Sequence, residues 1–160
     1  MLTSRLSRLG LGVAIALAAL VSAQSASAVI IPQKGMAGVR LGMTQAKVRA
    51  VLGSPKTIFK GKNEFGSFTN FNYARVQVSF QGNQRVTNLR TQHREEKTRG
   101  GVGFGTTERL LRARVRGLRC KTEYGFRHCW LGAFLAGRRV TNFMLSGGRV
   151  SRIDIGFVID

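Results

Sequence analysis

Apolar residues recur with helical spacing at two places in the chain, and a glycine-rich stretch precedes each place. GVRLGMTQAKVRAVLGSPK covers residues 38–56, and GVGFGTTERLLRARVRGLRC covers residues 101–120. In both, apolar residues three and four positions apart form one stripe, as on an amphipathic helix. Thr44 suits the N-cap of the first helix because its hydroxyl accepts a backbone N–H of the first turn, and Thr107 takes the same place in the second. The pattern predicts two short helices that begin alike.

Alternating apolar and polar residues follow each predicted helix, which is typical of a strand with one buried face. Val76, Val78 and Phe80 alternate with polar residues before a Gly-Asn turn. Ile153 and Ile155 alternate in the same way after a Gly-Gly turn. Glycine and asparagine at these turns favour hairpins. Each copy of the motif is therefore predicted to hold a helix, one or two irregular strands, and a hairpin.

The two copies predict one compact domain, because a unit of about sixty residues buries little apolar surface by itself. We expect an α+β fold of two tandem repeats, each a helix plus an antiparallel hairpin. Residues 29–96 make up the first repeat and residues 97–160 the second. The hairpins are expected to join in one sheet, with the helices on one of its faces.

The first 28 residues do not belong to this fold. Arg5 and Arg8 give a basic start, the run LGLGVAIALAALVSA is apolar, and small residues end at Ala28. This order is typical of a secretory signal peptide, here cleaved after Ala28. An uncleaved anchor or a buried helix is the alternative, but the run is short for a membrane span, which needs about 20 residues. We expect a secreted, monomeric protein with no transmembrane span in the mature chain.

The chain is strongly basic, with 26 Lys and Arg against 7 Asp and Glu and a formal net charge of +19. In an intracellular protein this charge would favour nucleic acid. For an exported protein we expect no nucleic acid, and consider wall polymers, anionic lipid or acidic protein surfaces, whose attraction weakens with salt. A GC-rich genome is an alternative source of the arginines. The second predicted helix region is the most basic, with Arg109, Arg112, Arg114 and Arg116.

Cys120 and Cys129 are the two cysteines of the chain. Export favours a disulfide, and two cysteines allow a single intrachain pairing. A free or metal-bound pair is the alternative. The C-x8-C spacing differs from that of a zinc site, and His128 alone does not complete a tetrahedral ligand set. We expect the disulfide, no metal ion and no other cofactor.

The sequence contains few residue combinations that are typical of a catalytic site. Asp154 stands on a predicted strand without a second carboxylate to form a glycosidase pair. His93 precedes two glutamates in a predicted linker, which we interpret as solvated. His128 beside Cys129 could suggest a nucleophilic pair, but the expected disulfide removes the thiol. GVGFG lacks the Lys-Ser/Thr of a phosphate-binding loop and matches GVRLG in the first copy. We expect no enzyme activity.

The duplicated motif, G-[IV]-x-[LF]-G-[MT]-T-x-x-x-[VL]-x-x-x-[LV]-G with a hairpin ending in R-V-[TS], resembles the outer-membrane assembly lipoprotein (SmpA/OmlA-like) domain. That domain shares a fold with the β-lactamase inhibitory protein. The matching residues are Gly38, Val39, Leu41, Gly42, Met43, Thr44, Val48, Leu52, Gly53 and Pro55, and then Gly101, Phe104, Gly105, Thr107, Leu111 and Val115. The tandem form is similar to the secreted inhibitor and to small exported actinobacterial proteins. The resemblance implies joined sheets that present one surface to a protein partner.

The polar residues between the buried strand positions form the candidate site. They are Arg75, Gln77, Ser79, Asn88, Arg90, Asn142, Arg152 and Asp154. We expect a non-catalytic protein that binds another exported or envelope protein through this open sheet face, in the manner of an inhibitor. The alternative is a basic surface protein held electrostatically on anionic wall polymer or lipid. A solvated sheet face without a partner is the simplest interpretation of the same pattern.

Overall fold

Two short helices and twelve strands form residues 29–159, the part of the chain that this computed structural model describes. The predicted signal peptide, residues 1–28, lies outside the described residues. The helices are α1 (Gln45–Leu52) and α2 (Glu108–Arg114). The strands are β1 (Val29–Ile30), β2 (Gly35–Met36), β3 (Val39–Arg40), β4 (Thr57–Asn63), β5 (Gly66–Asn72), β6 (Gln77–Gln81), β7 (Asn88–Thr91), β8 (Lys97–Thr98), β9 (Arg119–Glu123), β10 (Phe126–Gly132), β11 (Arg139–Ser146) and β12 (Arg149–Phe157).

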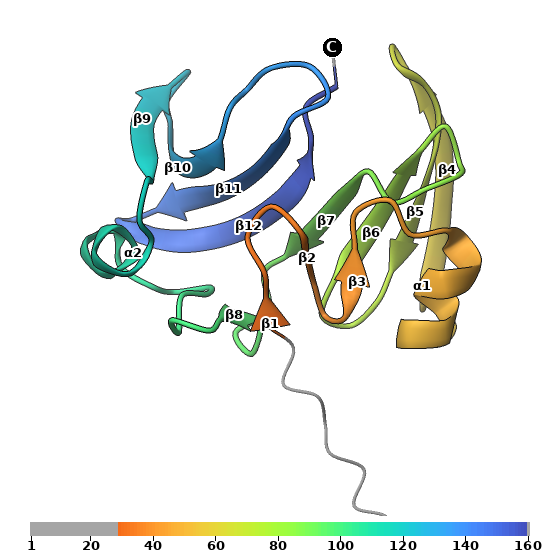
Figure 1. Ribbon diagram of the computed structural model, residues 1–160, viewed down its shortest axis with the longest axis horizontal. Helices are drawn as coiled ribbons and strands as arrows, with labels where there is room; N and C mark the ends of the chain where they lie inside the picture. Colours follow the sequence, from red (N-terminus) through yellow and green to blue (C-terminus); the bar gives the residue numbers. More distant parts are fainter. Residues whose placement is uncertain (1–28, 160) are drawn as a thin grey trace, which may run out of the picture.

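Eight of these strands form one antiparallel sheet in the order β4-β5-β6-β7-β12-β11-β10-β9. We call β4–β7 the first half of the sheet and β9–β12 the second half. The halves join where β7 pairs with β12, and Arg90 there lies opposite Asp154. In Figure 1 the green and yellow strands of the first half and the blue strands of the second half meet at this join. In each half the two strands of the last hairpin, β6–β7 and β11–β12, lie nearest the join.

The predicted α+β class is wrong, because the fold is mostly β. The helices have only eight and seven residues, while β4, β5 and β10, in the segments expected to hold one or two irregular strands per repeat, have seven residues each. Eight strands span roughly 35 Å, and an eight-residue helix is only about 12 Å long. Two such helices cannot cover a face of this sheet. α1 stops at Gly53, whose φ of 77° suits glycine and ends the helix.

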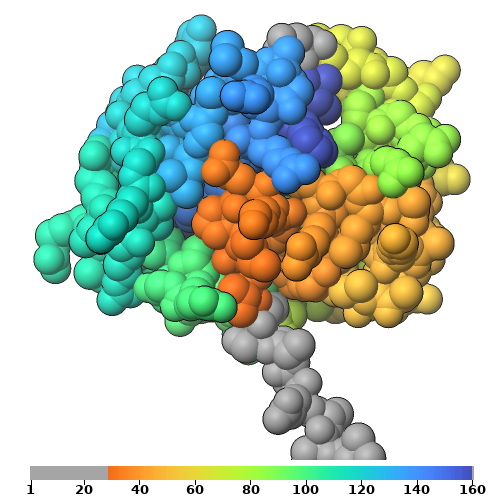
Figure 2. All heavy atoms as spheres, in the orientation of Figure 1, coloured from red at the N-terminus to blue at the C-terminus, as the bar shows by residue number. Residues whose placement is uncertain are grey.

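The N-terminal segment, residues 29–40, helps to cover the core face of the sheet, where the sequence predicted helices alone. Ile30, Met36 and Val39 are buried in the same core as Val48 of α1. β1 pairs in parallel with β8, so the start of this segment is tied to the residues that follow the first half of the sheet. Figure 2 shows this segment in orange on the surface, beside blue residues of the second half. The segment therefore holds the two parts of the chain together.

The two copies of the motif make matching contacts. Thr44 and Thr107 cap α1 and α2, each accepting a hydrogen bond from the backbone N–H three residues later, at 3.3 and 3.4 Å. After each hairpin turn an arginine, Arg85 or Arg149, donates to the carbonyl of the glycine two positions before the cap, at 3.0 Å in both cases. The sequence similarity therefore corresponds to a similar local structure.

The predicted disulfide between Cys120 and Cys129 is confirmed. The two residues lie directly opposite each other on β9 and β10, so the bond links the edge strand to its neighbour. Glu108 lies near both sulfurs, but these sulfurs are bonded to each other and offer no thiolate to a metal ion. Within residues 29–159 the longest helix has eight residues, so no helix there could span a bilayer.

Candidate functional site

One face of the sheet packs on the core, and the other is open. Val78, Leu89, Phe143 and Ile153 point into the core from four neighbouring strands. The residues between them project from the open face, where one residue from each strand lies in a single row. We call this set the central row. In spatial order it comprises Thr57, Asn72, Gln77, Arg90, Asp154, Asn142, Trp130 and Arg119.

An ion-paired group lies at the middle of the central row. The Nε of Arg90 donates to Oδ1 of Asp154 at 2.6 Å, and the Nε of Arg152 donates to Oδ2 at 2.7 Å. The Asp154 side chain is mostly buried, while both arginines keep about a third or more of their surface exposed. Charge-assisted hydrogen bonds of this length hold both guanidinium groups in place. Two cations share one anion, so the group has a net positive charge.

The three outer positions of the row in the first half, on β4, β5 and β6, carry neutral side chains that bond to one another. The side-chain amide of Gln77 donates to Oδ1 of Asn72 at 2.8 Å, and the amide of Asn72 donates to Oγ1 of Thr57 at 3.0 Å. Ser79 and Asn88 lie opposite each other in the next row. Beyond Arg90, this side of the open face therefore satisfies part of its hydrogen-bonding capacity internally and carries no charge along the row.

The second half carries aromatic and basic side chains instead. His128 stacks on Trp130 with ring centroids 5.1 Å apart, and Phe134 lies 5.5 Å from Trp130. The charged groups of Arg119 and Lys121 lie 5.6 and 5.9 Å from the centroid of the Trp130 ring. Cations at this distance from an indole interact favourably with it. His128 is fixed further by a 3.0 Å contact between its Nδ1 and Oδ1 of Asn142.

Two adjoining hollows open on this side. The aromatic hollow has a volume of about 470 Å³ and is lined by Lys121, Glu123, Tyr124, Phe126, His128, Phe134, Asn142 and Met144. The arginine hollow has a volume of about 400 Å³ and is lined by Asn88, Arg90, Phe134, Val140, Asn142, Arg152, Asp154, Gly156, Phe157, Val158 and Ile159. Phe134 and Asn142 border both hollows. A ligand could therefore occupy the two hollows together.

Most of the predicted site residues come together on the open face, but Arg75 does not join them. Arg75 lies in the loop before β6, and its guanidinium is 3.0 Å from the carboxylates of both Glu95 and Glu96. The prediction extended the alternation of β6 two residues too far, since the strand begins at Gln77. The glutamates were expected in a solvated linker, yet the Glu96 side chain is 0% exposed.

The basic helix residues lie apart from the central row. Arg109, Arg112 and Arg114 are exposed on α2, and Arg116 follows two residues after its end. Arg112 forms an ion pair with Glu108 at 2.9 Å. The other three arginines form no ion pair with any carboxylate of the described residues.

The aromatic hollow was not predicted from the sequence. His128 and Trp130 alternate with Cys129 along FRHCWLG, and the burial of Cys129 places them on the opposite, open face. The expected disulfide could have indicated this face, because half-cystines are usually buried. Phe134 stands in the loop after β10, where no periodic pattern reveals its direction. Loop residues of this kind become part of a site only through tertiary structure.

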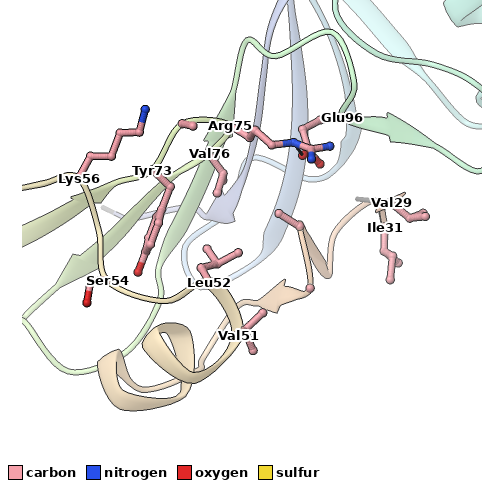
Figure 3. Close-up of a pocket in the computed structure, with 13 residues that line it drawn as sticks. Val29, Ile31, Val51, Leu52, Ser54, Lys56, Tyr73, Arg75, Val76 and Glu96 are labelled. Carbon is pink, nitrogen blue, oxygen red and sulfur yellow. Dashed lines mark ion pairs between the residues drawn. The ribbon is translucent and has the colours of Figure 1, made fainter. Parts of the chain in front are cut away.

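A further pocket of about 620 Å³ lies on the core side of the sheet, between α1, the N-terminal segment and the loop before β6. Figure 3 shows Val51 and Leu52 of α1 at one side and the Arg75–Glu96 pair at another. Burial raises the pKa of the Glu96 carboxyl, and the nearby Arg75 opposes this rise. Arg75 lies close enough to form an ion pair, but the Glu96 oxygens have no well-aligned hydrogen bond from any described residue.

Comparisons with known proteins identify a similar fold but no family. No protein-family model matches the sequence, and no curated protein is significantly similar to it. A solved structure, a DUF4309 family protein (YjgB) from Bacillus subtilis subsp. subtilis str. 168, is similar with a TM-score of 0.51 and 16% identity. The match covers 81% of this chain and 88% of that one. At this identity the likeness concerns the fold alone. The resemblance to the outer-membrane assembly lipoprotein domain and the inhibitor fold stays a prediction.

Proposed function

We propose that this protein is an exported, non-catalytic binding protein that recognises another exported or envelope protein through the open face of its sheet. One observation carries the proposal: three well-exposed aromatic side chains line the aromatic hollow. Tyr124 is 92% exposed, Phe126 65% and Phe134 49%. Clustered apolar surface with a polar rim is typical of interaction sites. Aromatic residues, Met and Arg are enriched in protein interfaces, and the binding energy concentrates in a few of them.

The contacts of the titratable groups support a non-catalytic role. Both oxygens of Asp154 accept hydrogen bonds from arginines, so neither is placed to take a proton from a substrate. Cys129 is bonded to Cys120 and cannot act as a nucleophile. His128 uses its Nδ1 against Asn142 and stacks its ring on Trp130. These side chains form a fixed surface better suited to recognition.

The disulfide supports export, because disulfides persist mainly in oxidising compartments outside the cytosol. The proposal therefore places the mature protein, beginning at Val29, outside the cell that makes it. It is expected to act as a monomer, with the open face available to a partner.

The exposed arginines favour a second candidate function. Arg109, Arg114 and Arg116 project near one end of the sheet without a carboxylate partner among the described residues. They could hold a basic surface protein on anionic wall polymer or lipid. Such attachment depends on total charge and weakens steeply with salt, whereas a packed protein interface is less sensitive to salt.

A capture experiment distinguishes the two functions. The oxidised mature chain would be immobilised, exposed to culture fluid and envelope extract of the source cell, and eluted in salt steps. Two variants would be treated in parallel: Phe134→Ala, and a triple variant with Arg109→Gln, Arg114→Gln and Arg116→Gln. We expect one discrete protein that stays bound above physiological salt to the wild type and the triple variant but not to Phe134→Ala. Retention only of polymer, lipid or many acidic proteins, lost in the triple variant, would overturn the proposal in favour of the second function.

A further inference from the structure

The ion-paired group at the middle of the sheet leaves hydrogen-bond donors unused. Each guanidinium has five N–H donors, and Arg90 and Arg152 each use one of them, at Nε, on Asp154. Their terminal amino groups donate to no acceptor among residues 29–159. An arginine held through Nε keeps its two terminal amino groups available. These groups can donate in parallel to the two oxygens of a carboxylate.

The surroundings make these donors a prepared anion site. Both arginines line the arginine hollow, where partial burial strengthens charge interactions relative to open water. Asp154 fixes the direction of both guanidinium groups, so an incoming anion would lose less entropy in ordering them. The site has two positive charges and one negative charge. A single negative charge completes the balance, whereas a phosphate dianion would meet stronger repulsion from Asp154.

We propose that the arginine hollow binds the side-chain carboxylate of an Asp or Glu on the partner protein, and that the aromatic hollow takes a large apolar side chain of the same segment. This inference rests on the proposed function and names the chemistry of its partner. Phe134 and Asn142 border both hollows, so the two side chains must come from neighbouring positions.

The strand spacing sets the separation of these two partner residues. His128 on β10 lies two strands away from Asp154 on β12 and two residues further along the strand direction, a separation of roughly 12 Å. An extended chain advances about 3.3 Å per residue and points alternate side chains to opposite faces, so the acidic and apolar residues stand four positions apart, on one face of an extended partner segment. Charge complementarity and spacing together define a short acidic–apolar motif.

Capped eight-residue peptides test the motif directly. The first contains one Glu and one Leu four positions apart in a Ser-Gly background; the second replaces the Glu with Gln; the third replaces the Leu with Ala. Trp130 is the single tryptophan of the chain and lies 5.5 Å from Phe134, so its fluorescence reports binding. We expect the Glu-Leu peptide to bind about tenfold or more tightly than the Gln peptide. Equal binding of the two, or no response to any peptide, would overturn the inference.

The variant Asp154→Asn distinguishes a prepared site from general attraction, because the two explanations predict opposite signs. The change makes the protein more positive, so general attraction predicts tighter binding of the Glu-Leu peptide. The proposed site predicts weaker binding, since the arginines lose their common anchor. Glu64→Gln, at an exposed turn of the first half, makes the same change in charge away from the hollows and is expected to leave binding unchanged. Circular dichroism checks that both variants fold, and tighter binding by Asp154→Asn overturns the inference.

Arg152→Gln separates this inference from the proposed function. If the captured protein is retained equally by the wild type and by Arg152→Gln, the proposed function survives and the carboxylate site is wrong. If no discrete protein is captured at all, the proposed function fails, and the peptide titration still decides whether the hollows bind a carboxylate.

Discussion

The two halves of the sheet share one backbone plan and differ on their open faces. Counting outward from the β7–β12 join along the central row, the third residue is Asn72 in the first half and Trp130 in the second. The fourth is Thr57 in one and Arg119 in the other. The caps and hairpins are fixed by backbone hydrogen bonding and core packing, so they match. Open-face positions are free of these constraints, and the second half uses them for aromatic and charged groups.

The outer strands differ in how they are held as well. Cys120 and Cys129 pair across β9 and β10, and the corresponding positions of β4 and β5 hold Ile58 and Phe71. Phe71 is buried, whereas Ile58 is 46% exposed at the edge. The half that carries the aromatic hollow therefore has a covalent link, and the other half depends on packing.

The largest expected effect comes from removing this link. In a double variant with Cys120→Ala and Cys129→Ala, we expect the free energy of unfolding to fall by about 2–3 kcal/mol, because the ring of about ten residues no longer restricts the unfolded chain. Denaturant unfolding measures the loss. Hydrogen exchange should show protection falling more in β9–β10 than in β4–β5. Equal loss in both strand pairs would show that the disulfide does not act locally.

The second prediction compares an exposed phenylalanine from each half. Phe134→Ala should weaken binding of the captured protein by about 30-fold, or about 2 kcal/mol, as removal of a central aromatic side chain does in other interfaces. Phe59 is 57% exposed on the open side of β4, and Phe59→Ala should change affinity by less than about twofold. Isothermal titration measures both. A comparable loss in the two variants would place the interface across the whole sheet.

Features set by local residues or by a regular alternation could be predicted from the sequence. Features without such a pattern could not. Thr44 and Thr107 were identifiable as caps because capping depends on local residues. The alternation around Gln77 and Asp154 was readable because β6 and β12 each have one buried face. The strand TIFKGKN could not be predicted in this way, since an edge strand that is exposed along nearly its whole length has no alternation of buried and exposed residues. This loss of signal led to the wrong fold class.

The third prediction concerns the attachment of α2 to the second half. Hydrogen bonds from Arg127, chiefly, and from Arg112 lower the pKa of Glu108 to about 2. Arg127 belongs to β10, so this ion pair joins helix and sheet, whereas the first turn of α1 reads Gln-Ala-Lys and has no such acid. Glu108→Gln should lower the free energy of unfolding at pH 7 by about 1 kcal/mol, as for a partly exposed ion pair.

The pH dependence of this effect follows from the lowered pKa. The folded value lies below that of the unfolded chain, so the contribution of Glu108 is complete above about pH 4.5 and is lost as pH falls toward 2. Wild type and Glu108→Gln should therefore converge in stability over this range. Denaturant unfolding at pH 7, 4 and 3 tests it, and a difference independent of pH would show that the ion pair is not the cause.

The smallest effect is expected at Glu96, near α1, whose pKa is shifted in the opposite direction to that of Glu108. Burial raises the pKa of Glu96, even with Arg75 nearby, so the folded state favours the protonated acid. Its stabilising contribution is complete below about pH 4.5 and is lost as pH rises through the folded pKa. Glu96→Gln resembles the protonated acid and should be slightly more stable than wild type at pH 7. This gain should be smaller than the loss in Glu108→Gln, because Arg75 remains partly solvated.

The control is Glu95→Gln, which removes the exposed partner of Arg75 and should leave stability unchanged. A clear destabilisation by Glu96→Gln at pH 7 would show that the Arg75 ion pair outweighs the cost of burial, and that charges anchor the neighbourhood of both helices.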